Sequence, residues 1–147
     1  MPALSLKVED LVPHRPPMVL IDAVESVDLP SATLVASFTA REEWSGNWFA
    51  LEYMAQTAAA LAGVFDREAG EAACRPGFLL GTRRLDLGIL RFVPGVKYMV
   101  KVVREYEDGD SAAFSCEIWE SEDGSQSGKC SATLTAYRPP QHKVLLA

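Results

Sequence analysis

The sequence has few basic residues, few cysteines and no long apolar run, and each shortage excludes a class of protein. Its 14 lysines and arginines are outnumbered by 20 aspartates and glutamates, which gives a formal net charge of −6. Proteins that bind nucleic acid need basic side chains to neutralise phosphates, so this balance argues against a nucleic-acid partner. A local basic patch remains open, and its candidates are Arg83, Arg84 and Arg91.

The three cysteines are scattered and lack the spacing of metal ligands. Cys116 and Cys130 lie in strand-like apolar runs, where we expect small buried residues. The N-terminus lacks the pattern of a signal peptide, and the most apolar stretch, residues 49–64, is interrupted by Glu52 and other polar residues. We therefore expect a cytoplasmic protein without a metal site or a membrane association.

What the sequence does contain predicts one domain built around one core. At 147 residues and 48% hydrophobic content, the chain is long enough for one well-filled core and too short for two ordinary domains. We find no internal repeat, linker or low-complexity segment, and we place the core at about residues 11–138.

The strongest predicted element is a helix over residues 48–67. Apolar residues recur there at helical spacing, and the other face is barely polar, which is typical of a helix buried in its own domain. Asn47 or Ser45 is expected to cap its start, and Gly70 to end it.

Six segments rich in β-branched and aromatic residues predict strands, with turn residues between them. Two precede the helix and four follow it, at residues 18–27, 32–39, 78–90, 96–106, 112–120 and 130–137. This order is an α+β plan with the helix packed on one antiparallel sheet. Several folds fit such a plan, and the pattern alone does not choose among them.

Three motifs follow one another along the chain: LVPHRPPMVLIDAV, then ALEYMAQTAAALAG, then FLLGTRRLDLGILRFVPG. Together they resemble the 3-hydroxyacyl-carrier-protein dehydratases of type II fatty-acid synthesis. The segments EYMAQ and GFLLGTRR resemble those of a divergent branch that includes dehydratase-like proteins of aryl-polyene gene clusters. The resemblance implies a hot-dog fold, in which a curved antiparallel sheet of about six strands wraps a long central helix. It also implies a dimer that joins two sheets, with the active site at the interface.

In the family that the chain resembles, a histidine in the loop before the helix works with a carboxylate on the partner's helix. The corresponding loop here, FTAREEWSGNWFALE, contains neither a histidine nor a Pro-Gly pair. A gapless match on Glu52 puts Phe38 at the position of the family's catalytic histidine. The sequence has two histidines, His14 in the first motif and His142 near the C-terminal end. Ordinary dehydratase chemistry is therefore in question.

Glu52 is the first candidate for a catalytic residue. It lies about one turn inside the predicted buried helix, and a carboxyl group there can serve as general acid or base. The alternative is a structural carboxylate held by backbone amides or by Arg15. His14 could replace the missing base if its loop reaches the helix start, or it could make a structural hydrogen bond before the first strand. Gln56, one turn beyond Glu52, could orient it or satisfy a buried backbone group.

Substrate-binding candidates lie at the helix start and on the third predicted strand. Asn47, Trp48 and Phe49 open the helix, and free amides there could polarise a thioester carbonyl as an oxyanion hole does. Arg83 and Arg84 could bind the phosphopantetheine or an acidic carrier protein through charge-assisted hydrogen bonds. Equally, they could be a solvated strand edge.

The leading hypothesis is a dimeric 3-hydroxyacyl-thioester dehydratase-like protein, a hydro-lyase of fatty-acid, polyketide or aryl-polyene synthesis. Its substrate would be carried by an acyl-carrier protein or coenzyme A, so no cofactor of its own is expected. Two alternatives stay open. One is an acyl-thioester hydrolase, because some hot-dog thioesterases need only a helix carboxylate to direct water. The other is a non-catalytic subunit that binds acyl-carrier protein or pairs, as a hetero-oligomer, with a related active dehydratase.

Overall fold

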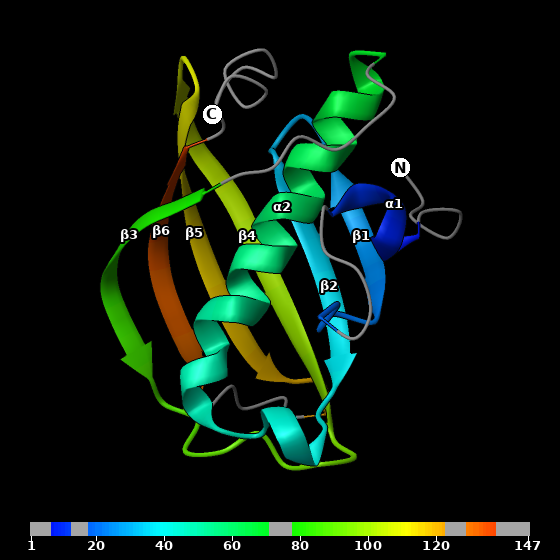
Figure 1. The fold of residues 1–147 in the computed structure, drawn as a ribbon, viewed down its shortest axis with the longest axis vertical. Coiled ribbons are helices and arrows are strands. Elements are labelled where there is room, and N and C mark those ends of the chain that lie inside the picture. The colour runs from blue at the N-terminus through cyan, green and yellow to red at the C-terminus, as the bar shows by residue number, and fades with distance from the viewer. Residues whose placement is uncertain (1–6, 13–17, 71–77, 123–128, 138–147) are drawn as a thin grey trace.

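A six-stranded antiparallel sheet curves around one long helix, as Figure 1 shows. The computed structural model describes residues 7–12, 18–70, 78–122 and 129–137. The strands lie in the order β1-β2-β4-β5-β6-β3. Their bounds are β1 Ala23–Asp28, β2 Thr33–Thr39, β3 Phe78–Leu87, β4 Lys97–Asp108, β5 Ser111–Glu120 and β6 Cys130–Tyr137. The long helix is α2, Ala50–Glu68, and a short helix, α1, spans Val8–Leu11.

The arrangement confirms the predicted α+β plan and the hot-dog fold that the resemblance implied. All six predicted strands form, but β1 begins at Ala23 and not at residue 18 as predicted. The reason is that the segment before Ala23 bonds to a helix side chain. Leu20 N donates to Gln56 Oε1 and Met18 O accepts from Gln56 Nε2, at 2.8 and 2.7 Å. Those backbone groups are therefore not available to a sheet ladder.

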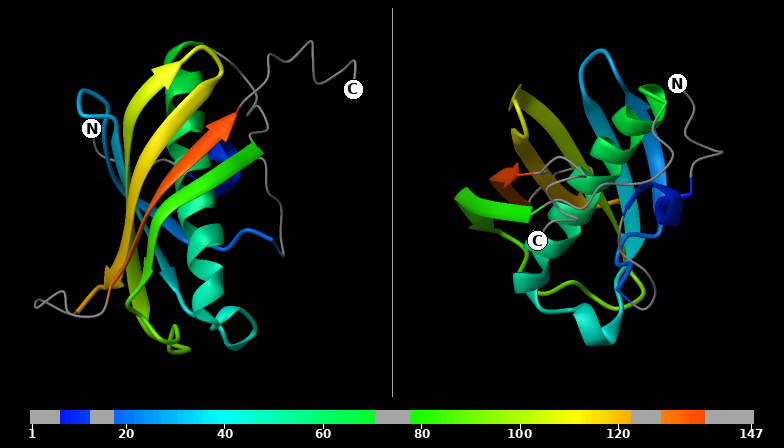
Figure 2. Two further views of the ribbon diagram at one scale, coloured as in Figure 1. Left: turned by 90° about the vertical axis from the view of Figure 1, so that its left-hand side faces the viewer. Right: turned by 45° about the horizontal axis from the view of Figure 1, so that its top comes forward.

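The core lies between the concave face of the sheet and α2, and Figure 2 shows the helix held inside the curve. Alternation along each strand sends one set of side chains to this face, for example Cys116 and Ile118 on β5, which are at most 1% exposed. Ala50 and Ala60, both 0% exposed, let the sheet approach the helix closely. Each large apolar side chain buried in this way contributes about 1.5–3 kcal/mol.

The two cysteines of the described segments are free and buried, as predicted. Burial raises the pKa of the Cys116 thiol to about 12, and it raises the pKa of Cys130 as well. Both are therefore inert core residues at neutral pH. Cys74 lies outside the described residues.

The short helix α1 was not predicted, and it packs directly on α2. Leu11 and Val12 are 0% exposed. A Cβ on Gly63 would collide with the backbone oxygen of Leu11, so only glycine lets the two helices approach this closely. Gly63 therefore has a packing role that its position inside the helical pattern did not reveal.

The ends of α2 give one correction and one confirmation. A 3₁₀ turn, η2 (Asn47–Phe49), precedes the helix, and neither turn nor helix has a side-chain cap, so the predicted capping by Asn47 or Ser45 is wrong. The turn supplies a backbone partner instead, since Phe49 N donates to Gly46 O at 3.1 Å. At the other end, Gly70 has a φ of 85° and follows the last turn, as predicted. Among the helices of the described segments, none is long and apolar enough to cross a membrane.

Candidate functional site

A carboxylate and an amide lie one turn apart near the start of α2. Gln56 is 0% exposed and all of its polar atoms are engaged. Besides its two bonds to the backbone before β1, its Nε2 donates to Glu52 Oε1 at 3.0 Å. Because the amide is fixed by the backbone of Met18 and Leu20, it holds the Glu52 carboxylate in one orientation.

Glu52 itself is half-buried. The sequence pattern, which placed it in a buried helix, suggested full burial. Part of its side chain instead stays exposed near the first turn of α2. A half-buried carboxyl group whose orientation is fixed by a hydrogen bond can exchange a proton with a group that reaches its exposed part. Any acid–base role of Glu52 would therefore be directed away from the core of this chain.

The ring of Phe38 lies in a closed cluster of aromatic rings. Its ring stacks on Tyr53 with centroids 3.7 Å apart and on Tyr98 at 5.3 Å, and Phe92 meets it edge-on at 5.5 Å. The four side chains are at most 3% exposed. Burial raises the pKa of Tyr53, whose hydroxyl donates to Trp44 O at 2.9 Å. We name this cluster (Phe38, Tyr53, Phe92 and Tyr98) the aromatic box. The side chain at position 38 is a phenyl ring, so it cannot transfer a proton.

The helix-start residues lie together, but they offer fewer donors than expected. Asn47 and Phe49 are half-buried, while Trp48 is 71% exposed. The amide of Phe49 bonds to Gly46 O, and that of Ala50 bonds to Asn47 O. These two donors are occupied, so an oxyanion hole at this turn would have to use other amides.

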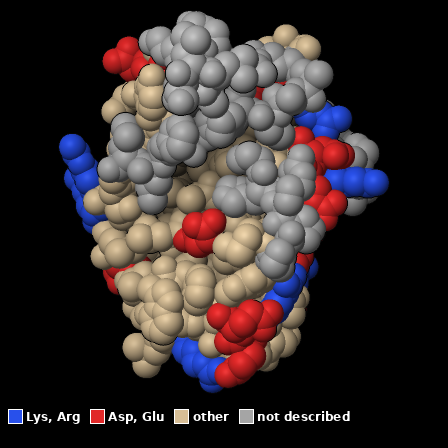
Figure 3. All heavy atoms as spheres, viewed as in Figure 1, with Lys and Arg blue, Asp and Glu red and all other residues tan. Residues whose placement is uncertain are grey.

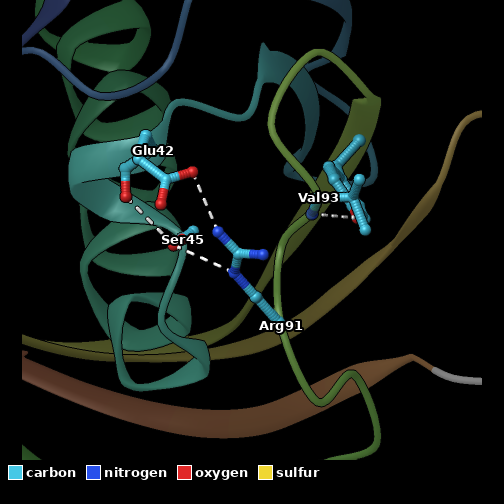
Figure 4. Close-up of polar contacts among 5 residues, drawn as sticks. Glu42, Ser45, Arg91 and Val93 are labelled. Carbon is cyan, nitrogen blue, oxygen red and sulfur yellow. Dashed lines mark hydrogen bonds and ion pairs between the residues drawn. The ribbon is translucent and has the colours of Figure 1, made fainter.

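Two loops are fastened together beside the helix start, as Figure 4 shows. Arg91, which follows β3, reaches Glu42 Oε2 at 2.9 Å and Ser45 Oγ at 3.3 Å. Phe92 N donates to Ser45 O at 2.8 Å, and Gly46 forms an isolated antiparallel bridge with Arg91. We name these contacts the Arg91 clasp. Arg91 is thus engaged within the chain by an ion pair and a hydrogen bond.

Arg83 and Arg84 lie on β3, which is an edge strand of the sheet. Both are exposed. The register shifts between Arg83 and Asp86, and Arg84 has a φ of 54° there, which is the geometry of a β-bulge. A bulge and exposed charge are typical of edge strands. His14 lies outside the described residues, so its predicted role stays a prediction.

A family model described as ApeP-like, ApeP dehydratase, matches residues 6–147. The chain belongs to the ApeP-like dehydratase family. This is the divergent dehydratase branch that the segments EYMAQ and GFLLGTRR indicated. No curated protein sequence is significantly similar to the chain.

Solved structures similar to this ApeP-like chain share its hot-dog fold. The dehydratase heterocomplex ApeI:P from Xenorhabdus doucetiae matches with a TM-score of 0.83 and 24% identity, over 96% of each chain. A hypothetical thioesterase protein with coenzyme A from Streptococcus pneumoniae matches with a TM-score of 0.61 and 10% identity, over 80% of this chain and 85% of that one. The PaaI protein from the phenylacetic acid degradation operon of E. coli matches at 0.57 and 11%, over 78% and 81%. At these identities the likeness shows the fold alone.

Proposed function

We propose that this chain is the carboxylate-bearing half of a 3-hydroxyacyl-thioester dehydratase, and that a related hot-dog chain supplies the base. One contrast carries the proposal. Phe38, which the gapless match puts at the position of the family's histidine, is sealed in the aromatic box, whereas Glu52 is half-buried and held by Gln56. A chain that keeps the carboxylate and lacks the histidine in the loop before the helix can be completed by a second chain that supplies one.

In the proposed reaction, the partner's imidazole takes the α-proton of the 3-hydroxyacyl thioester. The Glu52 carboxyl gives its proton to the departing β-hydroxyl, which leaves as water and yields the 2-enoyl thioester. Proton return from the imidazolium to the Glu52 carboxylate closes the cycle. Gln56 positions Glu52 throughout, because its own amide is fixed by two backbone bonds. The family membership supports this reaction class.

The substrate and its carrier are part of the same proposal. The acyl group would be carried on the phosphopantetheine of an acyl-carrier protein or of coenzyme A, in fatty-acid, polyketide or aryl-polyene synthesis. Arg83 and Arg84, exposed on β3, would pair with its phosphate or with acidic side chains of the carrier. A related chain of the ApeI:P kind is the proposed partner, since that similar structure is described as a heterocomplex.

The test is intact-mass spectrometry of a 3-hydroxyacyl-carrier protein. It is incubated with this chain alone, with a histidine-bearing hot-dog dehydratase chain from the same genome, and with both. We expect loss of one water with both chains, abolished by Glu52→Gln. Glu68→Gln, an exposed glutamate at the other end of α2, is the matched control and should leave the reaction unchanged. Full activity of the Glu52→Gln mixture would contradict the proposal.

An acyl-thioester hydrolase is the second candidate, and one observation favours it. Glu52 is half-buried and has an orientation fixed by Gln56, and a carboxylate held in this way can direct water at a thioester without a histidine. Release of free thiol by this chain alone, abolished by Glu52→Gln, would favour hydrolysis over water loss.

A further inference from the structure

The Arg91 side chain closes a short turn that precedes α2. This 3₁₀ turn is η1 (Glu42–Trp44), and it has no side-chain cap of its own. The guanidinium contacts Glu42 Oε2 where the turn begins and Ser45 Oγ just after it ends, at 2.9 and 3.3 Å. The same Ser45 hydroxyl donates to Glu42 O at 3.0 Å. Because Nε and Nη2 of one planar group engage both ends of the turn, they fix its direction as well as its distance from Arg91.

Tyr53 connects η1 to the first turn of α2. Its hydroxyl donates to the carbonyl oxygen of Trp44, which lies in η1, at 2.9 Å. Its ring meets the ring of Phe92 edge-on, with centroids 5.1 Å apart. Phe92 follows Arg91 directly in the chain, and its amide donates to Ser45 O at 2.8 Å. These contacts form a closed network that leads from Arg91 through η1 and Tyr53 to Phe92, the neighbour of Arg91.

The closed network reaches the candidate carboxylate through the backbone. Glu52 is next to Tyr53 in the first turn of α2. Tyr53 is 1% exposed and packed among rings, so its backbone has little room to move independently of the network. Gln56 holds the Glu52 carboxylate from one side, and the network holds the helix turn that carries Glu52. Placement matters for proton transfer, since a shift of about 1 Å can lower a rate about 100-fold.

The Arg91 clasp lies at the surface, so it can be removed while the domain stays folded. The side chains of Arg91 and Glu42 are 53% and 76% exposed. Figure 3 shows basic and acidic side chains next to one another at the lower end of the face, the end at which α2 begins in Figure 1. Exposed ion pairs add little to the stability of a fold. The loss of this one should therefore affect the placement of η1 more than the stability of the chain.

We propose that Arg91 is a positioning residue for the dehydration, and that it sets the Glu52 carboxylate through η1 and Tyr53. This inference rests on the proposed function, because it concerns the proton transfer assigned to Glu52. Arg91 touches no substrate atom in this role. Its effect is to keep the first turn of α2 in the one placement from which Glu52 reaches the β-hydroxyl.

The experiment measures kcat and KM for water loss from a 3-hydroxyacyl-carrier protein, with the histidine-bearing partner chain at saturating concentration. Arg91→Gln should lower kcat about tenfold and leave KM within about twofold of the wild-type value. Arg91→Lys keeps a charge beside Glu42 but loses the planar fork, so it should recover part of the loss. The matched control is Glu107→Gln, which breaks the exposed Arg104–Glu107 ion pair at the far end of β4 and should change neither constant. Urea denaturation checks that all the variants are as stable as the control.

A second background tests whether Arg91 acts through Glu52. Glu52→Asp keeps a carboxylate and shortens its side chain, so its placement is already lost and Arg91 has less left to position. Arg91→Gln should therefore lower kcat by a smaller factor in the Glu52→Asp chain than in the wild-type chain.

Wild-type kcat for Arg91→Gln, or the same loss of kcat in both backgrounds, would overturn the inference and leave the proposed function intact. A loss confined to KM would make Arg91 a substrate-binding residue and would overturn the inference too. A wild-type mixture that releases no water would instead remove the proposed function, and this inference with it.

Discussion

Replacing Gln56 with leucine tests whether its side-chain amide holds the segment before β1 against α2. Leucine fills much of the same space, so the change removes hydrogen bonds without leaving a large cavity. The buried amide of Leu20 loses its partner, which costs about 1–3 kcal/mol. Met18 is 54% exposed, so water can reach its carbonyl, and the loss of that bond adds about 1 kcal/mol or less.

The expected total is a loss of about 1–4 kcal/mol in the free energy of unfolding, compared with roughly 5–15 kcal/mol for the stability of a typical domain. Urea denaturation followed by circular dichroism measures it, provided that the slope is unchanged. Thr57→Val is the matched comparison, because Thr57 is also 0% exposed on α2. Its hydroxyl donates to the helical carbonyl of Tyr53 at 2.7 Å, which already takes part in the helix ladder. That change should cost less than about 1 kcal/mol.

A Gln56→Leu variant no less stable than Thr57→Val would refute this reasoning. It would mean that the segment before β1 finds other partners for Leu20 N, and that Gln56 does not hold Glu52 through a rigid connection. A large loss for Gln56→Leu alone would locate the stabilisation in the contact between α2 and the backbone before β1. Thermal unfolding of the same variants gives an independent ranking.

Three further predictions concern the core. Gly63→Ala should destabilise the fold by about 1–3 kcal/mol in urea, because its Cβ would collide with Leu11 O, while Gly81→Ala, with open space around it, should be near neutral. In native protein at pH 8, Cys116 and Cys130 should resist iodoacetamide, and peptide mapping should find both alkylated only in denaturant. Since burial raises the pKa of Cys116 from 9.0 to about 12, the unfolded chain releases a proton that the fold retains, so stability should fall as pH rises above about 9. Cys116→Ser should lessen this fall between pH 8 and pH 10 in urea titrations, and an unchanged pH dependence would contradict the assignment.

The fold was predictable from the sequence because its periodic patterns are local. Phe114, Cys116 and Ile118 alternate with polar residues on β5, and burial follows that alternation. The start of β1 was not predictable in this way. Leu20 bonds to a helix side chain 36 positions away, so the limit of the strand depends on tertiary contact and not on β propensity.

The candidate site was predictable where it lies within one element. Glu52 and Gln56 are four residues apart on a helix, and that spacing alone indicates contact. The aromatic box was missed, because its rings come from β2, α2, β4 and the loop that contains Phe92, which has no periodic pattern. Helix capping by Ser45 failed for a similar reason. Its hydroxyl donates to Glu42 O and accepts from Arg91, so the Arg91 clasp takes the group that a cap would use.

The aromatic box also bears on the proposal that a partner chain supplies the base. Tyr53 donates to Trp44 O, and the Tyr98 hydroxyl accepts from Val93 N, so the box fastens both loops that flank the start of α2. An imidazole at position 38 would replace the stacked Phe38 ring and would have to be desolvated among the other three rings, which costs free energy. If each site takes a histidine from one chain and a carboxylate from the other, a pair made with this chain has one complete site, at Glu52. The second interface of the pair, which faces Phe38, would then be structural, and substrate should bind productively once per pair.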